Sequence, residues 1–463
     1  MAKTKKAKSK KEKKSGKKFL LQSLKGMHDI LPESQPFWEK VRNSANKIAD
    51  FYNFLRIDTP LLEFAEIFEK TGEGTDIVEK EMYFVKTKGG DRLVLRPEGT
   101  APVVRAYIQH GLVKMPQPLR LFYIGPMFRH EQPQSGRFRQ HHQVGFEILG
   151  GDNDPIYDIF TILASFRLLE ELKIKNLMIQ INSIGCKQCR SAYSKKLQEY
   201  YKGKQDKICY DCKKRLISRP LRLLDCKNEK CAEIKIGAPV IIDKLCTNCK
   251  NHLKSILEHL DELSLPYSIN PYLVRGLDYY NGMVFEIFSE TGKEMNTDNN
   301  ENSNDKNNGQ NKELKEKTLN FTLASGGRYD GLAEMLGGLK ISAVGGSVGI
   351  ERAIEAMKFY GVSGVPKNEI KVFLIHIGEE AKKKNVFISE ELRKAGIKTV
   401  EYFGKDSLKS QLRAAHKGNA SLTLIIGQKE VFEESVIIRN MKTGVQEAVP
   451  LEKVGEEVKK RLK

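Results

Sequence analysis

Apolar positions first recur at helical spacing shortly after a polar N-terminal stretch. The residues in this pattern are Phe37, Val41, Ala45, Ile48 and Tyr52. Intervals of three or four residues put these side chains on one face of a helix. Ser34 and Pro36 precede them, and these residue types favour a helix cap and a first helical turn. The pattern predicts an amphipathic helix that packs on a sheet or at a subunit interface.

A different pattern follows in residues 119–131 and 137–149, where apolar and polar positions alternate. Alternation is typical of strands with one buried face. Turn-forming residues lie between the two segments, so we predict an antiparallel hairpin. In the second strand the core face is Val144, Phe146 and Ile148, and the polar face is Arg139, His141, Gln143, Gly145 and Glu147. The alternation alone favours an ordinary solvated face, although an arginine fork on it could grip phosphate oxygens.

The pattern changes again near residue 370. Three apolar runs, KVFLIHI, IKTVEYF and SLTLIIG, alternate with helical stretches. Strands that alternate with helices predict a layered α/β domain. We place it at residues 367–463, after a main domain at residues 19–366. On its helix SLKSQLRAAHKG and just before it, basic residues recur every four positions and could meet RNA phosphates, or simply form a solvated face. They are Lys405, Lys409, Arg413 and Lys417.

Composition changes this picture at two places. Residues 1–18 carry ten Lys and one Glu, which is about half of the net charge of +19. Residues 291–318 are rich in Asn. Neither segment has enough apolar surface to fold, so we expect a disordered tail and a disordered loop. The tail fits either a phosphate-binding arm or a solubilising extension. No apolar run approaches the ~20 residues of a membrane span, and no secretory signal is evident. We expect a cytoplasmic protein that does not contact a membrane.

All eight cysteines fall within a short part of the main domain. They form the pairs Cys186/Cys189, Cys209/Cys212, Cys226/Cys231 and Cys246/Cys249. Local clustering in a cytoplasmic chain favours a metal site over a disulfide framework. The spacing fits two tetrahedral zinc sites, one zinc site plus spare thiols, or buried thiols without metal. We predict that residues 186–265 form a Cys-rich insertion within the main domain.

Several segments together resemble the class II aminoacyl-tRNA synthetases in their histidine-specific form. FRHEQPQSGRFRQHHQVGFEILG at 128–150 resembles motif 2, and VGGSVGIERAIEAM at 344–357 resembles motif 3. LVRGLDYYNGMVFEIF at 273–288 and ASGGRYDGL at 324–332 resemble the two histidine-specific motifs. LRPEGTAPVVRAY at 95–107 resembles the loop that meets the amino acid. The segments occur in family order, which makes chance a poor explanation.

The resemblance implies a role for each matching residue. Arg129 and Arg275 would be catalytic, on opposite sides of the α-phosphate of ATP. The implied ATP-binding residues are Arg129, Glu131 and Arg352. The implied histidine-binding residues are Glu98, Gly99, Thr100, Gln143, Glu147, Arg275, Tyr279 and Tyr280. Each has a plainer alternative when taken singly: Glu98 as a helix cap, Arg275 as a structural ion pair, and the tyrosine doublet as core.

The resemblance also implies an architecture and partners. The fold would be the α+β class II core, an antiparallel sheet with flanking helices, plus a C-terminal α/β anticodon-binding domain. The substrates would be L-histidine, ATP with Mg²⁺, and tRNA(His), and the protein would be a homodimer. The main alternative is a catalytically silent, synthetase-like regulatory subunit of histidine biosynthesis. Such proteins typically lack the anticodon domain and have eroded motifs. A further alternative is a zinc-bearing RNA-binding or sensor protein with an inactive core.

Overall fold

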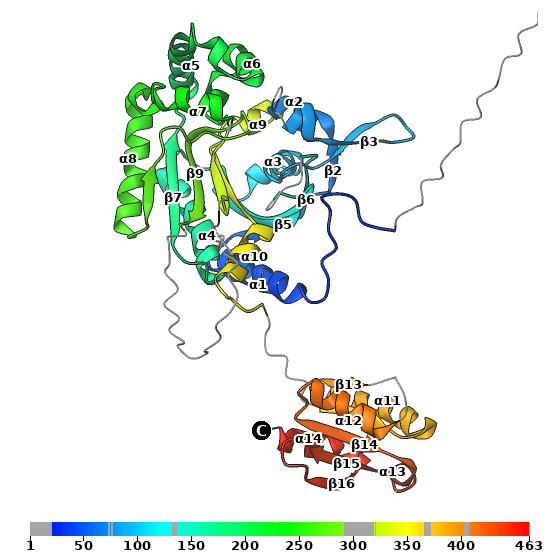
Figure 1. Cartoon of the computed structure of the whole chain (residues 1–463). Coiled ribbons are helices and arrows are strands. Elements are labelled where there is room, and N and C mark those ends of the chain that lie inside the picture. Colours follow the sequence, from blue (N-terminus) through cyan, green and yellow to red (C-terminus); the bar gives the residue numbers. More distant parts are fainter. Residues whose placement is uncertain are drawn as a thin grey trace, which may run out of the picture. The chain divides into compact units, whose positions relative to one another are not determined.

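The computed structural model describes most of the chain (Figure 1). The described residues are 21–72, 75, 77–131, 137–226, 228–290, 319, 321–364, 372–401 and 407–462. The predicted tail at residues 1–18 and the predicted loop at 291–318 lie outside them. The chain divides into two compact units after Gly364. The boundary predicted from the sequence was two residues later, after residue 366.

An eight-stranded sheet forms the centre of the first unit. Its strands, in spatial order, are β1 (Leu55–Arg56), β5 (Leu119–Phe128), β6 (Gln140–Leu149), β11 (Ala343–Gly349), β10 (Ala324–Arg328), β9 (Asn281–Ser289), β7 (Leu177–Ser183) and β8 (Tyr267–Ile269). Neighbouring strands are antiparallel except for the two outermost pairs, β1 with β5 and β7 with β8. The fold class expected from the resemblance is confirmed.

The predicted hairpin is confirmed as β5 and β6, with Leu119 opposite Leu149 and Phe128 opposite Gln140. The side chains of Val144, Phe146 and Ile148 are buried, as the alternation required. The opposite face differs from an ordinary solvated face, because Glu147 is only 1% exposed. Strand β11 pairs with β6 along its whole length and helps to enclose this end of the hairpin.

Three helices cover one part of this sheet. They are α1 (Gln35–Phe51), α4 (Pro155–Glu171) and α10 (Ile350–Phe359), and α1 contacts both of the others. The predicted amphipathic helix is α1, which buries Trp38, Val41 and Ala45. Ser34 occupies its N-cap position, but the Ser34 side chain makes no capping hydrogen bond.

A small antiparallel sheet and short helices surround the start of the amino-acid loop. The sheet has the order β2 (Leu62–Phe64), β4 (Arg92–Leu95) and β3 (Tyr83–Lys86), and the helices are α2 (Ala65–Gly72), α3 (Thr100–Gln109) and α9 (Leu332–Met335). Helix α3 begins directly after the segment RPEG at 96–99, so the fold fixes where that segment lies.

The Cys-rich segment is helical and lies between β7 and β8 in the chain. Its main helices are α5 (Lys187–Tyr201), α6 (Tyr210–Ser218), α7 (Glu229–Ile236) and α8 (Thr247–Glu262). Side chains such as Tyr193, Leu223 and Ile256 are buried and belong to the same apolar cluster as the sheet. The segment is therefore packed onto the rest of the unit (Figure 1).

The second unit has its own five-stranded sheet. Its strands, in spatial order, are β13 (Thr399–Glu401), β12 (Val372–His376), β14 (Leu422–Ile426), β15 (Ser435–Asn440) and β16 (Gln446–Pro450). The helices are α11 (Glu379–Lys394), α12 (Leu408–Lys417), α13 (Gln428–Phe432) and α14 (Val454–Arg461). The three predicted apolar runs are confirmed as strands β12, β13 and β14. Lys409, Arg413 and Lys417 are exposed on α12, whereas Lys405 lies outside the described residues.

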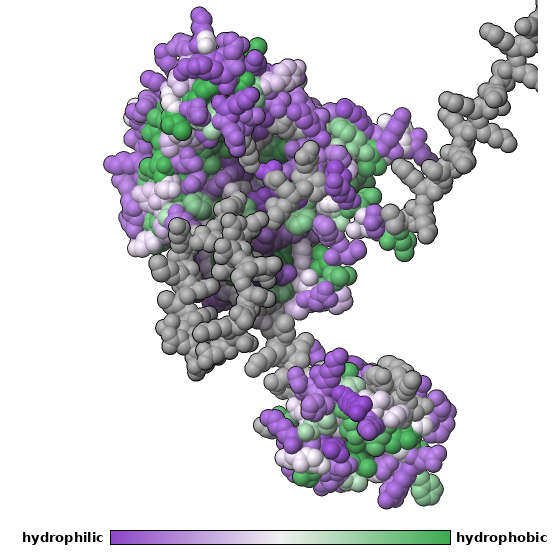
Figure 2. Space-filling view, in the orientation of Figure 1, coloured by the Kyte–Doolittle hydropathy of each residue, from purple (hydrophilic) through white to green (hydrophobic). Residues whose placement is uncertain are grey.

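Within the ranges that the structure describes, no helix combines the length and the apolar character needed to cross a membrane. The surface of the first unit in Figure 2 is mainly hydrophilic, with smaller hydrophobic areas between.

Candidate active site

A polar cavity of about 370 Å³ opens along the middle of the large sheet. Strands β6, β9, β10 and β11 contribute to its lining, together with Arg275, Leu277, Tyr279 and Tyr280. Nine of the residues implied by the resemblance line it: Glu98, Thr100, Arg129, Glu131, Gln143, Arg275, Tyr279, Tyr280 and Arg352. The other two, Gly99 and Glu147, lie behind the lining. A larger cavity of about 1310 Å³ on the same unit is mainly apolar and contains none of these residues.

The arginines that resemble motifs 2 and 3 are each oriented by a backbone carbonyl. Arg129 Nε donates to the Pro97 carbonyl at 2.8 Å. Arg352 Nη1 donates to the Thr322 carbonyl at 2.8 Å. A carbonyl partner fixes a guanidinium group without cancelling its charge. Both guanidinium groups are therefore fixed on the cavity wall, and Glu131 Oε1, 3.9 Å from Arg129 Nη1, offsets part of the Arg129 charge.

Arg275 is held differently, by a carboxylate and a hydroxyl. Its Nη1 donates to Glu286 Oε1 at 2.5 Å and its Nη2 donates to Ser325 Oγ at 2.7 Å. Its Nε is buried and has no hydrogen-bond partner among the described residues. Arg275 therefore forms the ion pair that a purely structural role would predict, but this pair with Glu286 lies on the cavity wall.

Glu98 is both a helix cap and a cavity residue. Its two carboxylate oxygens accept hydrogen bonds from the amides of Thr100 at 2.6 Å and Ala101 at 2.9 Å, at the start of α3. Burial raises the pKa of Glu98 above its usual range. Next to it, Gly99 has no room for a side chain, because a Cβ atom there would lie 2.3 Å from the Tyr123 ring.

Glu147 is a buried acid beneath the cavity floor. It accepts hydrogen bonds from Thr100 Oγ1 at 2.8 Å and from the Tyr329 hydroxyl at 2.5 Å. Burial raises its pKa to about 8, although these two donors favour the charged form. The neighbouring strand makes room for it with Gly345, where a Cβ atom would lie 1.6 Å from a Glu147 oxygen.

Three tyrosines form an aromatic wall at the same end. The ring centroids of Tyr279 and Tyr280 are 4.8 Å apart, and Tyr329 meets both rings edge-on. Burial raises the pKa of all three hydroxyls, so they remain neutral hydrogen-bonding groups. The doublet is buried, as a core pair would be, yet both residues also line the cavity.

His141, on the polar face of β6, is kept uncharged. Burial is the main cause that lowers its pKa to about 3, and the nearby charges of Arg129 and Arg352 act in the same direction. The imidazole is therefore neutral at physiological pH and adds no positive charge to a cavity that already contains several arginines.

Some lining residues did not emerge from the sequence. Glu286, Thr322 and Ser325 form a network around Arg275, in which Thr322 Oγ1 donates to Glu286 Oε2 at 2.9 Å. Asp225 reaches the cavity from the Cys-rich insertion. The alternation in VFEIF could have shown that Glu286 faces away from its apolar neighbours. No local signal could have brought Asp225 here, because it comes from a separate helical segment.

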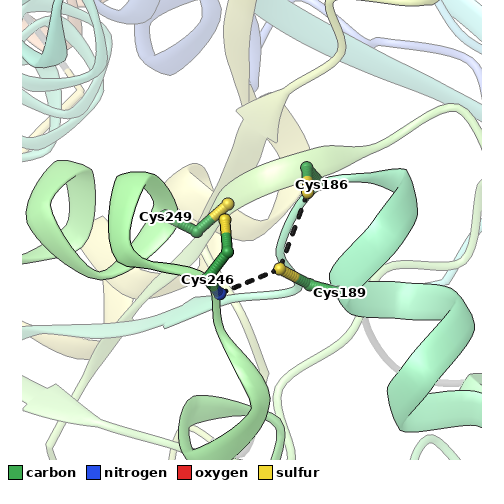
Figure 3. A group of neighbouring side chains, drawn as sticks. All are labelled: Cys186, Cys189, Cys246 and Cys249. Carbon is green, nitrogen blue, oxygen red and sulfur yellow. Dashed lines mark hydrogen bonds between the residues drawn. The ribbon is translucent and has the colours of Figure 1, made fainter.

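The eight cysteines form two groups. Cys186, Cys189, Cys246 and Cys249 make the first group, and Cys209, Cys212, Cys226 and Cys231 make the second. Within each group the sulfur atoms all lie within 4.8 Å of one another, and none of the eight thiols is in a disulfide. Figure 3 shows that the first group joins the start of α5 to the start of α8.

Comparison with known proteins covers both units. The family model for histidyl-tRNA synthetase matches residues 26–189, and the model for an anticodon binding domain matches residues 371–461. The histidine–tRNA ligase of Dehalococcoides mccartyi is 41% identical over 444 residues, which are 96% of this chain and 100% of that protein. The chain belongs to the histidyl-tRNA synthetase family.

Other members of the histidyl-tRNA synthetase family are also similar to this chain over most of its length. The Thermosipho melanesiensis histidine–tRNA ligase is 44% identical over 431 residues, which are 92% of this chain and 96% of that protein. The crystal structure of apo Staphylococcus aureus histidyl-tRNA synthetase has a TM-score of 0.74 and 31% identity, and it covers 95% of this chain and 100% of that chain. A Bacillus halodurans protein, described as an ATP phosphoribosyltransferase regulatory subunit/histidyl-tRNA synthetase, shares the fold at 21% identity, a TM-score of 0.59, and coverage of 89% of this chain and 99% of that chain.

The buried acid Glu147 makes the stability of the substrate-free protein depend on pH. Its pKa is about 8 in the folded state, against an ordinary value of 4.5. The folded state binds the proton more tightly, so stability present at low pH is lost as pH rises through about 8. We expect the thermal unfolding midpoint to fall between about pH 5 and pH 8, from the unfolded pKa to the folded one, and Glu147→Gln to reduce this fall because an amide does not ionise.

Scanning calorimetry at several pH values tests this expectation. Glu66→Gln is the matched control, since the Glu66 side chain is 78% exposed. Equal pH slopes for Glu147→Gln and the wild type would contradict the assignment of a raised pKa to Glu147.

Proposed function

We propose that the protein activates L-histidine with ATP and transfers it to the 3′ end of tRNA(His). One observation carries the proposal: Arg129, Arg275 and Arg352 line a single cavity that also contains a tyrosine and carboxylate pocket. Fixed positive charge suits a triphosphate, and the pocket suits a small polar amino acid. The family membership supports the same reaction.

The first step needs no nucleophile from the protein. The carboxylate of histidine attacks the α-phosphorus of ATP, a new P–O bond forms, and the bond to pyrophosphate breaks. The main obstacle is that negative charge approaches negative charge. Arg129 and Arg275 would contact the α-phosphate and offset the charge that grows in the transition state. In the second step the terminal ribose hydroxyl of the tRNA attacks the adenylate carbonyl, and AMP leaves.

The histidine pocket would be the end of the cavity near α3. Tyr279 and Tyr280 would line the imidazole, and Glu98, Thr100 and Gln143 would bind the ammonium and polar groups of the amino acid. Glu147 would act from beneath them, through its hydrogen bond with Thr100 Oγ1. A site that pairs both ring nitrogens rejects apolar amino acids strongly, because those would leave its buried polar groups without partners. When the ammonium group binds, it would favour the charged form of Glu147.

The rest of the cavity would hold ATP. Glu131 would lie near the adenine and Arg352 near the outer phosphates. The donor set also fits Mg²⁺, which in nucleotide sites takes one or two carboxylates together with phosphate oxygens. Glu286 and Glu351 are carboxylates on the same lining. Bound Mg²⁺ would neutralise part of the phosphate charge.

The second unit would bind the anticodon region of the tRNA. The matching family model supports this assignment. The exposed face of α12 adds Lys409, Arg413 and Lys417, which suit contacts with phosphates. A cytoplasmic location would suit the same role. The regulatory-subunit alternative remains weaker, because such proteins typically lack this unit and this chain retains all three arginines.

We expect histidine, and none of the other nineteen amino acids, to drive ATP–pyrophosphate exchange. Arg275→Ala should lower the exchange rate by at least about 100-fold, since it removes a group that stabilises transition-state charge. Lys213→Ala, at an exposed site, is the control. A folded protein that exchanges with no amino acid would contradict the proposed activity and favour the regulatory subunit.

We also propose that each cysteine group binds one structural zinc ion. Tetrahedral Zn–S bonds of about 2.3 Å require sulfur atoms roughly 3.8 Å apart. In the structure, the sulfur atoms of Cys186 and Cys189 are 3.6 Å apart, and those of Cys209 and Cys226 are 3.8 Å apart. These distances suit a shared metal and are too long for a disulfide of about 2.05 Å.

Backbone amides support thiolates at both groups. The amide of Cys246 donates to the Cys189 sulfur at 3.1 Å, and the amide of Cys209 donates to the Cys231 sulfur at 3.2 Å. Amide donors of this kind stabilise the negative charge of zinc-bound sulfur. Each cysteine group has one such amide–sulfur hydrogen bond, so we propose two zinc ions per chain.

Metal analysis of the purified protein should give about two zinc ions per chain, and about one in either Cys189→Ser or Cys212→Ser. Each variant should also unfold at a lower temperature, because metal binding contributes to folding. Ser191→Ala, on the same helix as Cys189, should change neither value. Metal-free protein with an unchanged unfolding temperature would leave the cysteines as simple buried thiols.

We further propose a homodimer formed through the apolar surface of the first unit. Leu55, Leu62, Phe64 and Phe84 are each at least 42% exposed. The first three of them line the apolar cavity of about 1310 Å³, and part of this surface is visible over β2 and β3 in Figure 2. Exposed apolar surface of this extent is typical of a protein interface. A second copy of the chain is the occupant that the family membership favours.

Light scattering after size exclusion should give twice the chain mass of 52.6 kDa. Phe64→Glu should shift the protein toward the monomer, because a buried unpaired charge opposes association. Phe432→Glu is the control, since Phe432 is 90% exposed on the second unit. If Phe64→Glu remains as dimeric as the control, the interface lies elsewhere.

A further inference from the structure

The segment from Arg275 to Tyr280 carries three of the residues assigned to catalysis and histidine binding. It is not a strand or a helix, so its own backbone hydrogen bonds do not fix it. We propose that three arginines of the Cys-rich insertion, Arg190, Arg219 and Arg222, position this segment for the reaction. This inference rests on the proposed function, and it makes the insertion part of the activation site as well as a separate subdomain.

Two of the arginines bind the backbone of the segment. Arg190 Nη1 donates to the carbonyl of Tyr280 at 2.9 Å, with a longer contact to that of Asp278 at 3.4 Å. Arg222 Nη1 donates to the carbonyl of Arg275 at 3.1 Å. The carbonyls of Arg275 and Tyr280 belong to residues whose side chains line the cavity. Their position therefore decides where those side chains lie.

The third arginine binds a side chain of the segment. Arg219 Nε lies 2.6 Å from a carboxylate oxygen of Asp278. Asp278 itself is not among the residues that line the cavity. Its role would be to connect the segment to the insertion. The segment is thus held at its beginning, in its middle and at its end.

The packing around this contact leaves little freedom. The Arg222 side chain is only 11% exposed, and a Cβ atom at Gly276 would lie 3.1 Å from its Nη1. Partly buried charged hydrogen bonds are stronger than neutral ones, and they resist competition from water. Because a shift of about 1 Å at a reacting group can cost ~100-fold in rate, such contacts can matter without touching substrate.

The two cysteine groups lie on either side of the arginines along the chain. Arg190 directly follows Cys189 of the first group, and Arg219 and Arg222 lie between Cys212 and Cys226 of the second. A metal ion at each group would therefore hold the backbone that carries the arginines. The cysteine groups lie outside the polar cavity, but they fix the wall that holds Arg275.

A third cavity shows that insertion and catalytic residues share one space. It measures about 720 Å³ and overlaps the polar cavity of about 370 Å³. Arg222, Asp225 and Cys226 of the insertion line it together with Arg129 and Arg275. The insertion thus contributes part of the wall of the nucleotide site.

Arg222→Gln in the full-length, metal-loaded protein is the first test. We expect kcat/KM for histidine in pyrophosphate exchange to fall by about 10- to 100-fold, mainly through kcat, because the segment loses its register. Arg222→Lys keeps a cationic donor and should stay within about threefold of the wild type. Lys213→Gln removes an exposed charge from the same insertion and should be unchanged. Zinc content and unfolding temperature should match the wild type in all three.

Hydrogen–deuterium exchange of the peptide that spans residues 275–280 gives a readout independent of activity. Its amides should exchange faster in Arg222→Gln and in the less buried Arg219→Gln than in Lys213→Gln, and faster after zinc removal. Unchanged exchange and unchanged kinetics in both arginine variants would overturn the positioning role. If the wild type itself shows no histidine-dependent activity, the proposed function is rejected. The hydrogen–deuterium exchange experiment would still decide whether the arginines position the segment.

Discussion

Four arginines are held close together in one polar cavity, and the surrounding structure must offset their mutual repulsion. Arg129, Arg137, Arg275 and Arg352 all line the same polar space. Like charges held close together in a partly buried site oppose folding. Glu131 and Glu286 offset part of this charge through ion pairs with Arg129, Arg137 and Arg275. A bound triphosphate would offset the remaining positive charge. The repulsion that destabilises the empty protein would therefore strengthen nucleotide binding.

The fold holds the residues around these arginines in fixed positions. The large sheet holds Gln143, Glu286 and Ser325 on paired strands, where the register leaves little freedom. Close packing reinforces this rigidity, since Gly345 leaves only enough space for the Glu147 carboxylate. The irregular segment at 275–280 is the exception. Contacts from the insertion take the place of strand pairing there, which links a peripheral subdomain to the chemistry of the site.

The sequence predicted the fold well where the pattern is local. The alternation in β5 and β6 identified the hairpin and its core face, and the ordered motifs indicated which segments meet at the cavity. The burial of Glu147 was not predicted, because alternation shows which face a residue occupies but not what covers that face. Here Tyr329 covers it, from a strand end 182 positions away in the chain.

The sequence also could not predict which residues far apart in the chain lie together in the fold. The cysteine spacing left open whether there were two complete groups, and only the fold joins Cys186 and Cys189 to Cys246 and Cys249. The second group is enclosed between these two pairs in the sequence. The contacts of Arg190, Arg219 and Arg222 were also hidden, because a basic residue on a charged helical segment is most often solvated. Such contacts depend on how the insertion packs, and no periodicity encodes that packing.

Calorimetric titration with hydrolysis-resistant aminoacyl-adenylate analogues tests whether this cavity binds both histidine and the nucleotide, because it measures recognition of both halves of the intermediate at once. We expect the histidyl analogue to bind at least ~1,000-fold more tightly than the phenylalanyl analogue, because the apolar ring would leave buried polar groups without partners. We also expect Arg129→Ala to weaken binding of the histidyl analogue. Equal affinity for the two analogues would contradict the assignment of this cavity to histidine.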